Sequence, residues 1–132
     1  MPDGRDRAET PKSDGALLGS WSATRWQYTS RARPERLVDV VCDLRGTVTL
    51  SLSEGTFILA WDIAGSGGQS IGGTYTVRDQ ELELAPSDAG AVEKVAFRLG
   101  LDELSLRSAE SAWDFDGGQE EPADFVAVFV RL

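Results

Sequence analysis

Alternating apolar and polar residues, interrupted at short intervals by turn residues, are the feature that most limits how this chain can fold. Residues 46–52 place Val48, Leu50 and Leu52 on one face and hydroxyl side chains on the other, which is the period of a half-buried strand. The turn sequence Ser-Glu-Gly-Thr follows, and residues 57–63 continue the alternation in a second strand. The chain contains no clear helical stretch, so we predict an all-β fold.

Similar segments recur from residue 17 onward, most of them joined by tight turns. About eight short strands in an antiparallel series favour an up-and-down eight-stranded barrel, because closure removes exposed sheet edges. A two-sheet sandwich is the alternative. Residues 34–44 are left open between a helical turn, an extended strand and a wide loop. The predicted strands cover residues 17–30, 46–52, 57–63, 71–78, 81–86, 92–100, 103–108 and 123–132.

The domain organisation follows from the same pattern. Residues 1–16 are polar and aperiodic, so we predict a disordered N-terminal tail. Residues 17–132 then form one barrel domain, a size that suits a single core. The first residues lack the apolar segment of a secretory signal. This indicates a cytoplasmic protein, or a secreted or periplasmic one whose leader has been removed.

The charge and composition of the chain exclude several classes of function. With 22 acidic against 13 basic residues and a net charge of −9, the protein repels nucleic acid and anionic membrane surfaces. No run of about 18 apolar residues is present, so no membrane span is predicted. The chain has no histidine, which excludes Ser-His and Cys-His nucleophile systems and the usual zinc sites. We therefore expect no enzyme, no catalytic residue, no metal and no cofactor.

Cys42 is the only cysteine of the chain, so no intrachain disulfide can form. Its segment, LVDVVCDL, is largely apolar, and we predict that the side chain is a small buried hydrophobe. A reactive thiol would need positive charge nearby, whereas the next residue is Asp43.

The most acidic segment, SAWDFDGGQEEPADF, occupies residues 111–125 and raises the question of a calcium site. Oxygen ligands at alternate positions suit Ca²⁺. The EF-hand pattern fails, however, because Gly118 stands where a third ligand is needed and Phe125 where a bidentate Glu is needed. Asp-Gly-Gly is a strong turn signal and Pro122 suits the start of a strand, so we predict a connection between two strands. The carboxylates are Asp114, Asp116, Glu120, Glu121 and Asp124.

Two motifs at the ends of residues 17–132 make this segment similar to the lipocalin-type (calycin) barrel, and the order of the segments LLGSWSAT, GTVTLSLSEGTFIL, GGTYTVRDQELEL and DFDGGQEEPADF resembles small bacterial lipocalin-like domains. Gly19-Ser20-Trp21 is a G-x-W triplet at the start of the first strand, and Arg131 lies at the end of the last one. The resemblance implies that Arg131 stacks across Trp21 and closes the barrel. A guanidinium over an indole ring contributes roughly 0.5–2 kcal/mol.

The resemblance also implies a small hydrophobic ligand inside the barrel, although eight strands can instead be filled by their own side chains. Gly72 and Gly73 either open volume there or mark a bulge. The predicted ligand-binding residues are Phe57, Leu59, Trp61, Tyr75, Phe97 and Phe125, and Val77, Leu82, Leu99, Leu104 and Phe129 also face inward by alternation.

Trp26 and Tyr28 have the opposite parity to Trp21, so they are predicted to face outward, under the connection at residues 30–45, unless a bulge intervenes. The predicted function is a non-catalytic binding domain for a small hydrophobic ligand. The alternative is a filled barrel that presents an acidic and aromatic surface to a protein partner.

Overall fold

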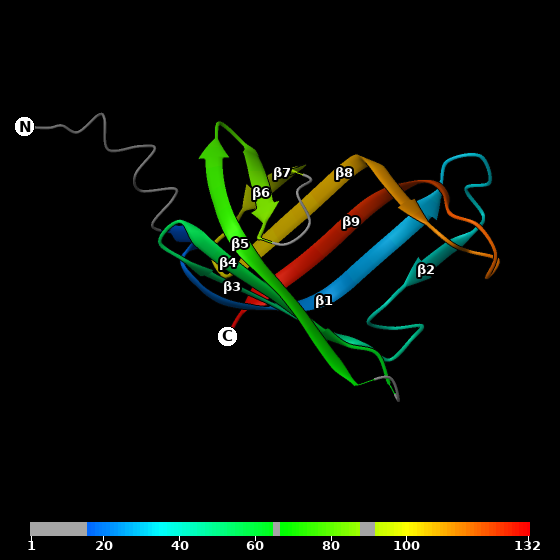
Figure 1. Cartoon of the computed structure of the whole chain (residues 1–132), viewed down its shortest axis with the longest axis horizontal. Coiled ribbons are helices and arrows are strands. Elements are labelled where there is room, and N and C mark those ends of the chain that lie inside the picture. The colour runs from blue at the N-terminus through cyan, green and yellow to red at the C-terminus, as the bar shows by residue number, and fades with distance from the viewer. Residues whose placement is uncertain (1–15, 65–66, 88–91) are drawn as a thin grey trace, which may run out of the picture.

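The computed structural model describes residues 16–64, 67–87 and 92–132, and these residues form an all-β barrel (Figure 1). From β3 to β9 each strand pairs antiparallel with the next, and β9 also pairs with β1. In the described part of the chain, eight strands therefore form a closed up-and-down barrel, as predicted, and the sandwich is excluded. The strands are β1 (Gly19–Ser30), β2 (Leu37–Asp39), β3 (Thr47–Ser53), β4 (Thr56–Asp62), β5 (Gly68–Arg78), β6 (Glu81–Pro86), β7 (Glu93–Leu99), β8 (Glu103–Trp113) and β9 (Glu121–Arg131).

Two further expectations concern the ends and the surroundings of this barrel. The predicted disordered tail, residues 1–16, lies outside the described residues except for its last position. Among the residues that are described, no helix is long and apolar enough to cross a membrane.

The segment 34–44, left open by the sequence, contains the short strand β2 followed by a turn. β2 lies outside the closed ring and pairs antiparallel with the second half of β1. The Asp39 side chain, which is buried, fixes the turn: its Oδ1 accepts the backbone N–H of Val41 at 2.9 Å and that of Trp26 at 3.2 Å. One carboxylate thus joins the turn to β1.

Cys42 lies in this turn and is exposed, so the prediction of a buried hydrophobe is wrong. The charge of Asp39 is the main cause that raises the pKa of the Cys42 thiol, and Asp43 adds to the effect. The chain turns at this point because the Asp39 carboxylate accepts hydrogen bonds from several backbone N–H groups. The turn leaves the cysteine side chain exposed.

One end of the barrel is closed by Trp21 and Arg131. Trp21 is completely buried, and the guanidinium carbon of Arg131 lies 4.1 Å from the centroid of its ring. The two terminal nitrogens of Arg131 donate to backbone carbonyls before β1, that of Leu18 at 3.0 Å and that of Ala16 at 2.7 Å. The last strand is therefore tied to the chain that enters the first strand.

Gly19 and Leu17 complete this closed end. Gly19 has a φ of +128°, and a Cβ at this position would approach the Nη1 of Arg131 to 3.1 Å. The indole N–H of Trp21 donates to the carbonyl of Leu17 at 3.0 Å. The glycine of the G-x-W triplet is thus required both by its backbone conformation and by the arginine that passes next to it.

The side chains predicted to face inward by alternation do so, and they form the core. Seven of these are buried and four are half-buried against the core, all within the described residues. The buried ones are Phe57, Tyr75, Leu82, Phe97, Leu104, Phe125 and Phe129, and the half-buried ones are Leu59, Trp61, Val77 and Leu99.

A bulge in β1 reverses the predicted orientation of two aromatic residues. The register of β1 with β9 shifts between Ala23 and Arg25, where Thr24 is an extra residue. After such an insertion the strand continues with its two faces exchanged. Trp26 and Tyr28 consequently lie on the inner face and pack against the core, so the exception made for a bulge applies and the expected outward orientation does not hold.

A second bulge, in β8, has the same effect at the other side of β9. The register shifts between Ser108 and Ser111. Beyond it, Trp113 lies against Tyr28, with ring centroids 4.5 Å apart and ring planes at 16°. The two bulges thus bring an indole and a phenol from strands on either side of β9 into a stack.

Gly72 and Gly73 allow backbones to approach each other. A Cβ at Gly73 would lie 2.1 Å from the carbonyl oxygen of Ala85, and one at Gly72 would lie 3.2 Å from that of Phe57. These glycines let β5 pack tightly against β6 and β4.

Replacement of Arg131 by alanine is expected to lower the free energy of unfolding by about 2 kcal/mol, because it removes a cation–π contact and two charged hydrogen bonds. Arg131→Lys should recover only part of the loss, since an ammonium group cannot reproduce the forked geometry. Urea unfolding followed by circular dichroism measures both. Arg98→Ala, on the outer face of β7, is the control, and an equal loss for both alanine variants would contradict the assignment.

Candidate functional site

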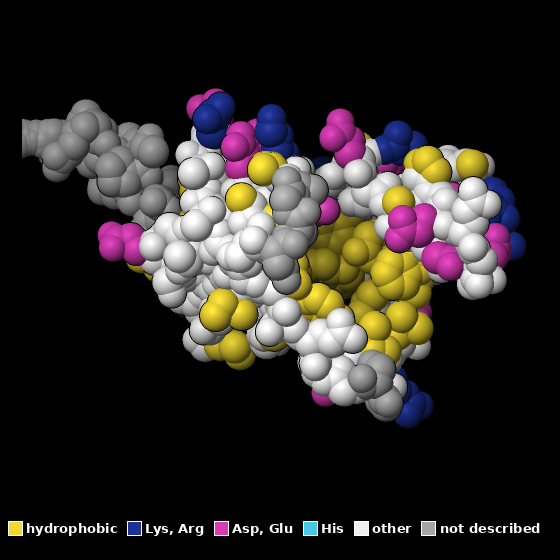
Figure 2. All heavy atoms as spheres, in the orientation of Figure 1, with side chains coloured by type: hydrophobic (Ala, Val, Ile, Leu, Met, Phe, Trp, Pro, Cys, Tyr) yellow, Lys and Arg dark blue, Asp and Glu magenta, His cyan; other side chains and the backbone are white. Residues whose placement is uncertain are grey.

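The barrel contains a cavity of about 530 Å³ that opens to solvent. Figure 2 looks into this hollow, whose walls are hydrophobic, with acidic side chains beside it. Trp26 and Tyr28 of β1 and Phe125 of β9 line the cavity, and they lie toward the ends of these strands remote from Trp21 and Arg131. The barrel is therefore closed at one end and hollow toward the other.

Most of the lining is apolar and comes from seven strands. Three of the aromatic members are in mutual contact: Trp26 and Phe125 meet edge to face at 4.7 Å, and the indole N–H of Trp26 donates to the Tyr28 hydroxyl at 3.1 Å. These contacts fix the ring orientations before any ligand enters. The described lining residues are Trp26, Tyr28, Phe57, Leu59, Ile71, Leu84, Pro86, Glu93, Val95, Leu106, Glu110, Ser111, Ala112, Glu120 and Phe125.

The predicted ligand-binding residues divide into two groups. Phe57, Leu59 and Phe125 line the cavity, whereas in the described lining Trp61, Tyr75 and Phe97 do not appear. Tyr75 and Phe97 are buried in the core, and Trp61 borders a separate hollow formed by residues of β3, β4 and β5.

Sequence reasoning missed Trp26 and Tyr28 as lining residues, because strict alternation places them outside. No glycine or proline marks the bulge at Thr24. The signal that was available is the aromatic composition itself, since two large rings facing water would be unusual in a strand that begins with a buried tryptophan.

Three glutamates give the lining its charge: Glu93 from β7, Glu110 from β8 and Glu120 from the β8–β9 connection. The described residues of the lining include neither lysine nor arginine. Burial is the main cause that raises the pKa of the Tyr28 hydroxyl, and the charges of Glu93 and Glu120 raise it further. Tyr28 is therefore a neutral phenol at neutral pH, within reach of negative charge.

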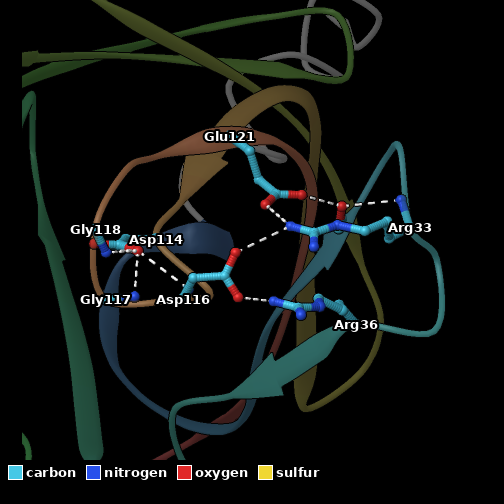
Figure 3. Close-up of polar contacts among 8 residues, drawn as sticks. Arg33, Arg36, Asp114, Asp116, Gly117, Gly118 and Glu121 are labelled. Carbon is cyan, nitrogen blue, oxygen red and sulfur yellow. Dashed lines mark hydrogen bonds and ion pairs between the residues drawn. The ribbon is translucent and has the colours of Figure 1, made fainter.

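The acidic connection beside the cavity is held by its own backbone (Figure 3). One oxygen of Asp114 accepts the N–H groups of Asp116, Gly117 and Gly118 at 3.2, 2.7 and 2.9 Å. Gly117 has a φ of +80°, which glycine adopts without strain. The turn signal in the sequence thus corresponds to an aspartate-stabilised turn.

Arginines from the β1–β2 connection pair with this loop. Arg33 donates to Asp116 at 3.2 Å and to Glu121, and Arg36 pairs with Asp116 (Figure 3). The hydroxyl of Ser30, itself 1% exposed, also donates to Glu121. These acids therefore act in joining two connections at the same end of the barrel. Within the described residues, no group of three or more metal-binding side chains is placed to hold an ion.

Comparison with known proteins adds no family to this description. No protein-family model matches the chain, and no curated protein matches it. The all-β, closed antiparallel barrel is compatible with a calycin-like fold.

Glu121→Gln is expected to destabilise the protein at neutral pH but not in acid. The Ser30 hydroxyl is the main cause that lowers the pKa of Glu121 from its ordinary value of 4.5, and Arg33 lowers it further. A lowered pKa adds stability above the ordinary value, and this stability is lost as the pH falls through the folded-state pKa. Thermal unfolding of both proteins from pH 7 to pH 3 tests this.

The matched control is Glu54→Gln, an exposed residue in the β3–β4 turn, which should show no such convergence with the wild type. A stability difference between Glu121→Gln and the wild type that is independent of pH would mean that the charge of Glu121 is not what holds the two connections together.

Proposed function

We propose that this protein is a lipocalin-like binding domain that holds a small apolar molecule in the barrel. The observation that carries the proposal is the cavity of about 530 Å³ with mainly apolar walls. Small-molecule sites commonly enclose about 300–1,000 Å³ and combine such walls with a few polar groups. The barrel, the G-x-W triplet and the Arg131–Trp21 contact support the lipocalin-like assignment.

The arrangement of the aromatic rings supports binding of a rigid, flat molecule. Trp26, Tyr28 and Phe125 hold one another in place through ring contacts and a hydrogen bond. Rings that are fixed in the free protein lose little conformational freedom when a ligand packs on them. Aliphatic side chains on the facing strands, among them Ile71 and Leu84, add apolar surface that makes no directional contacts with a ligand.

We expect binding without chemical turnover. The chain has no histidine, and Cys42 lies on the turn after β2, outside the described lining of the cavity.

The alternative, a filled barrel with an acidic and aromatic surface for a protein partner, has less support. Its aromatic candidates, Trp26 and Tyr28, point inward, and two of its acids, Asp116 and Glu121, are paired with arginines.

A neutral apolar dye tests the proposal. N-phenyl-1-naphthylamine should bind the wild type saturably, with enhanced fluorescence, and should raise the melting temperature through linkage. Ile71→Trp places a large ring in the cavity and should reduce this binding by about tenfold or more, because the added volume competes with the dye. Fluorescence titration and thermal unfolding provide the two measurements.

The control is Ile58→Trp, the same substitution on the neighbouring strand, at a side chain that is 55% exposed on the outer face. It should leave dye binding unchanged. Absence of saturable binding to the folded wild type, or equal binding by the two tryptophan variants, would refute a ligand site in the cavity.

A further inference from the structure

We infer that the molecule held in the cavity is an organic cation: an apolar, preferably aromatic body that carries a protonated amine. This inference rests on the proposed function, since it requires that the cavity binds a ligand, and it adds the sign of the ligand's charge. It is drawn from the charges of the lining, from the aromatic wall and from the placement of nearby bases.

The described residues of the lining carry charge of one sign only. Glu93, Glu110 and Glu120 come from two strands and one connection, so the fold and not one local acidic run brings them to the cavity. Among the residues that the structure describes, no ion pair joins any of the three to a lysine or arginine. A cation entering the cavity would therefore meet carboxylates that have no counter-ion among the described residues.

The nearby arginines are already engaged. The bases of the adjacent β1–β2 connection are all paired: Arg31 with Asp124, Arg33 with Asp116 and Glu121, and Arg36 with Asp116. They offer no positive charge to a carboxylate ligand at the cavity. A fatty acid or another organic anion would lose hydration on entry and face three negative side chains, so the lining selects against it.

The aromatic wall favours a cation for an independent reason. The faces of indole, phenol and phenyl rings carry negative electrostatic potential and attract ammonium groups. Trp26, Tyr28, Phe57 and Phe125 supply such rings in one cavity. Burial is the main cause that raises the pKa of the Tyr28 hydroxyl, and the charges of Glu93 and Glu120 add to it in the same direction, as expected for carboxylates beside the aromatic wall.

Three naphthalene compounds of nearly equal size test the inference: 2-(1-naphthyl)ethylamine, 2-(1-naphthyl)ethanol and the anion of 1-naphthaleneacetic acid. Calorimetric titration of the full chain at pH 7 should rank the protonated amine first, about tenfold tighter than the alcohol, and the carboxylate last. Raising the salt concentration should reduce the advantage of the amine and leave the alcohol unchanged. Ile71→Trp should weaken all three, which locates them in the cavity.

Charge-neutral variants identify the residues responsible. The triple variant Glu93→Gln, Glu110→Gln, Glu120→Gln should reduce amine affinity to that of the alcohol and leave alcohol affinity unchanged. The control triple variant Glu35→Gln, Glu54→Gln, Glu103→Gln changes the net charge equally at exposed sites outside the lining, and should retain most of the preference for the amine.

The outcomes separate this inference from the proposed function. Binding of the alcohol with no preference for the amine, or equal loss of that preference in both triple variants, overturns the cationic ligand while the binding function stands. Failure of the neutral dye and of all three naphthalene compounds to bind overturns both. Amine binding that Ile71→Trp leaves intact places the cation on the surface and also overturns the inference.

Discussion

Pairing between β1 and β9 is the constraint on which the rest of the structure depends. It runs from Trp21 to Ser30 along one edge of β1, whereas the other edge is shared between β3 at the beginning of the strand and β2 near its end. Without this long pairing the sheet would have two open edges and no interior. Both the closed end and the cavity are built on these two strands.

A single extra residue gives β1 its two roles. Before Thr24 the strand turns Trp21 inward, where Arg131 covers it, and after the bulge it turns Trp26 and Tyr28 inward as well. The two ends of the barrel therefore differ in chemistry. At one end, the guanidinium of Arg131 is fully engaged by an indole face and two backbone carbonyls. The other end combines aromatic rings with carboxylates that lack a counter-ion among the described residues.

The sequence predicts this fold well where alternation is regular, because a period of two assigns every residue to a face. It therefore identifies the all-β barrel, its strands and its inward side chains, including Phe57 and Phe125. It fails at the bulges. The position of an inserted residue depends on the register with a strand that is distant in the sequence, and neither glycine nor proline indicates the bulge at Thr24. It also fails at Cys42, whose exposure follows from the hydrogen bonds that Asp39 makes across the turn. Pairing of Arg33 with Glu121 is likewise set by closure, since the two lie 88 residues apart in the chain.

The distribution of the tryptophans along the barrel has a consequence for its optical behaviour. Trp21 lies under a guanidinium at the closed end, Trp26 stands in the cavity wall beside Phe125, and Trp113 stacks on Tyr28 farther along. Each of these three indoles lies in an environment of different polarity and contacts a different partner, so their emission bands and quenching efficiencies should differ. Light emitted by Trp26 should therefore report on the cavity, and light emitted by Trp21 on closure of the barrel.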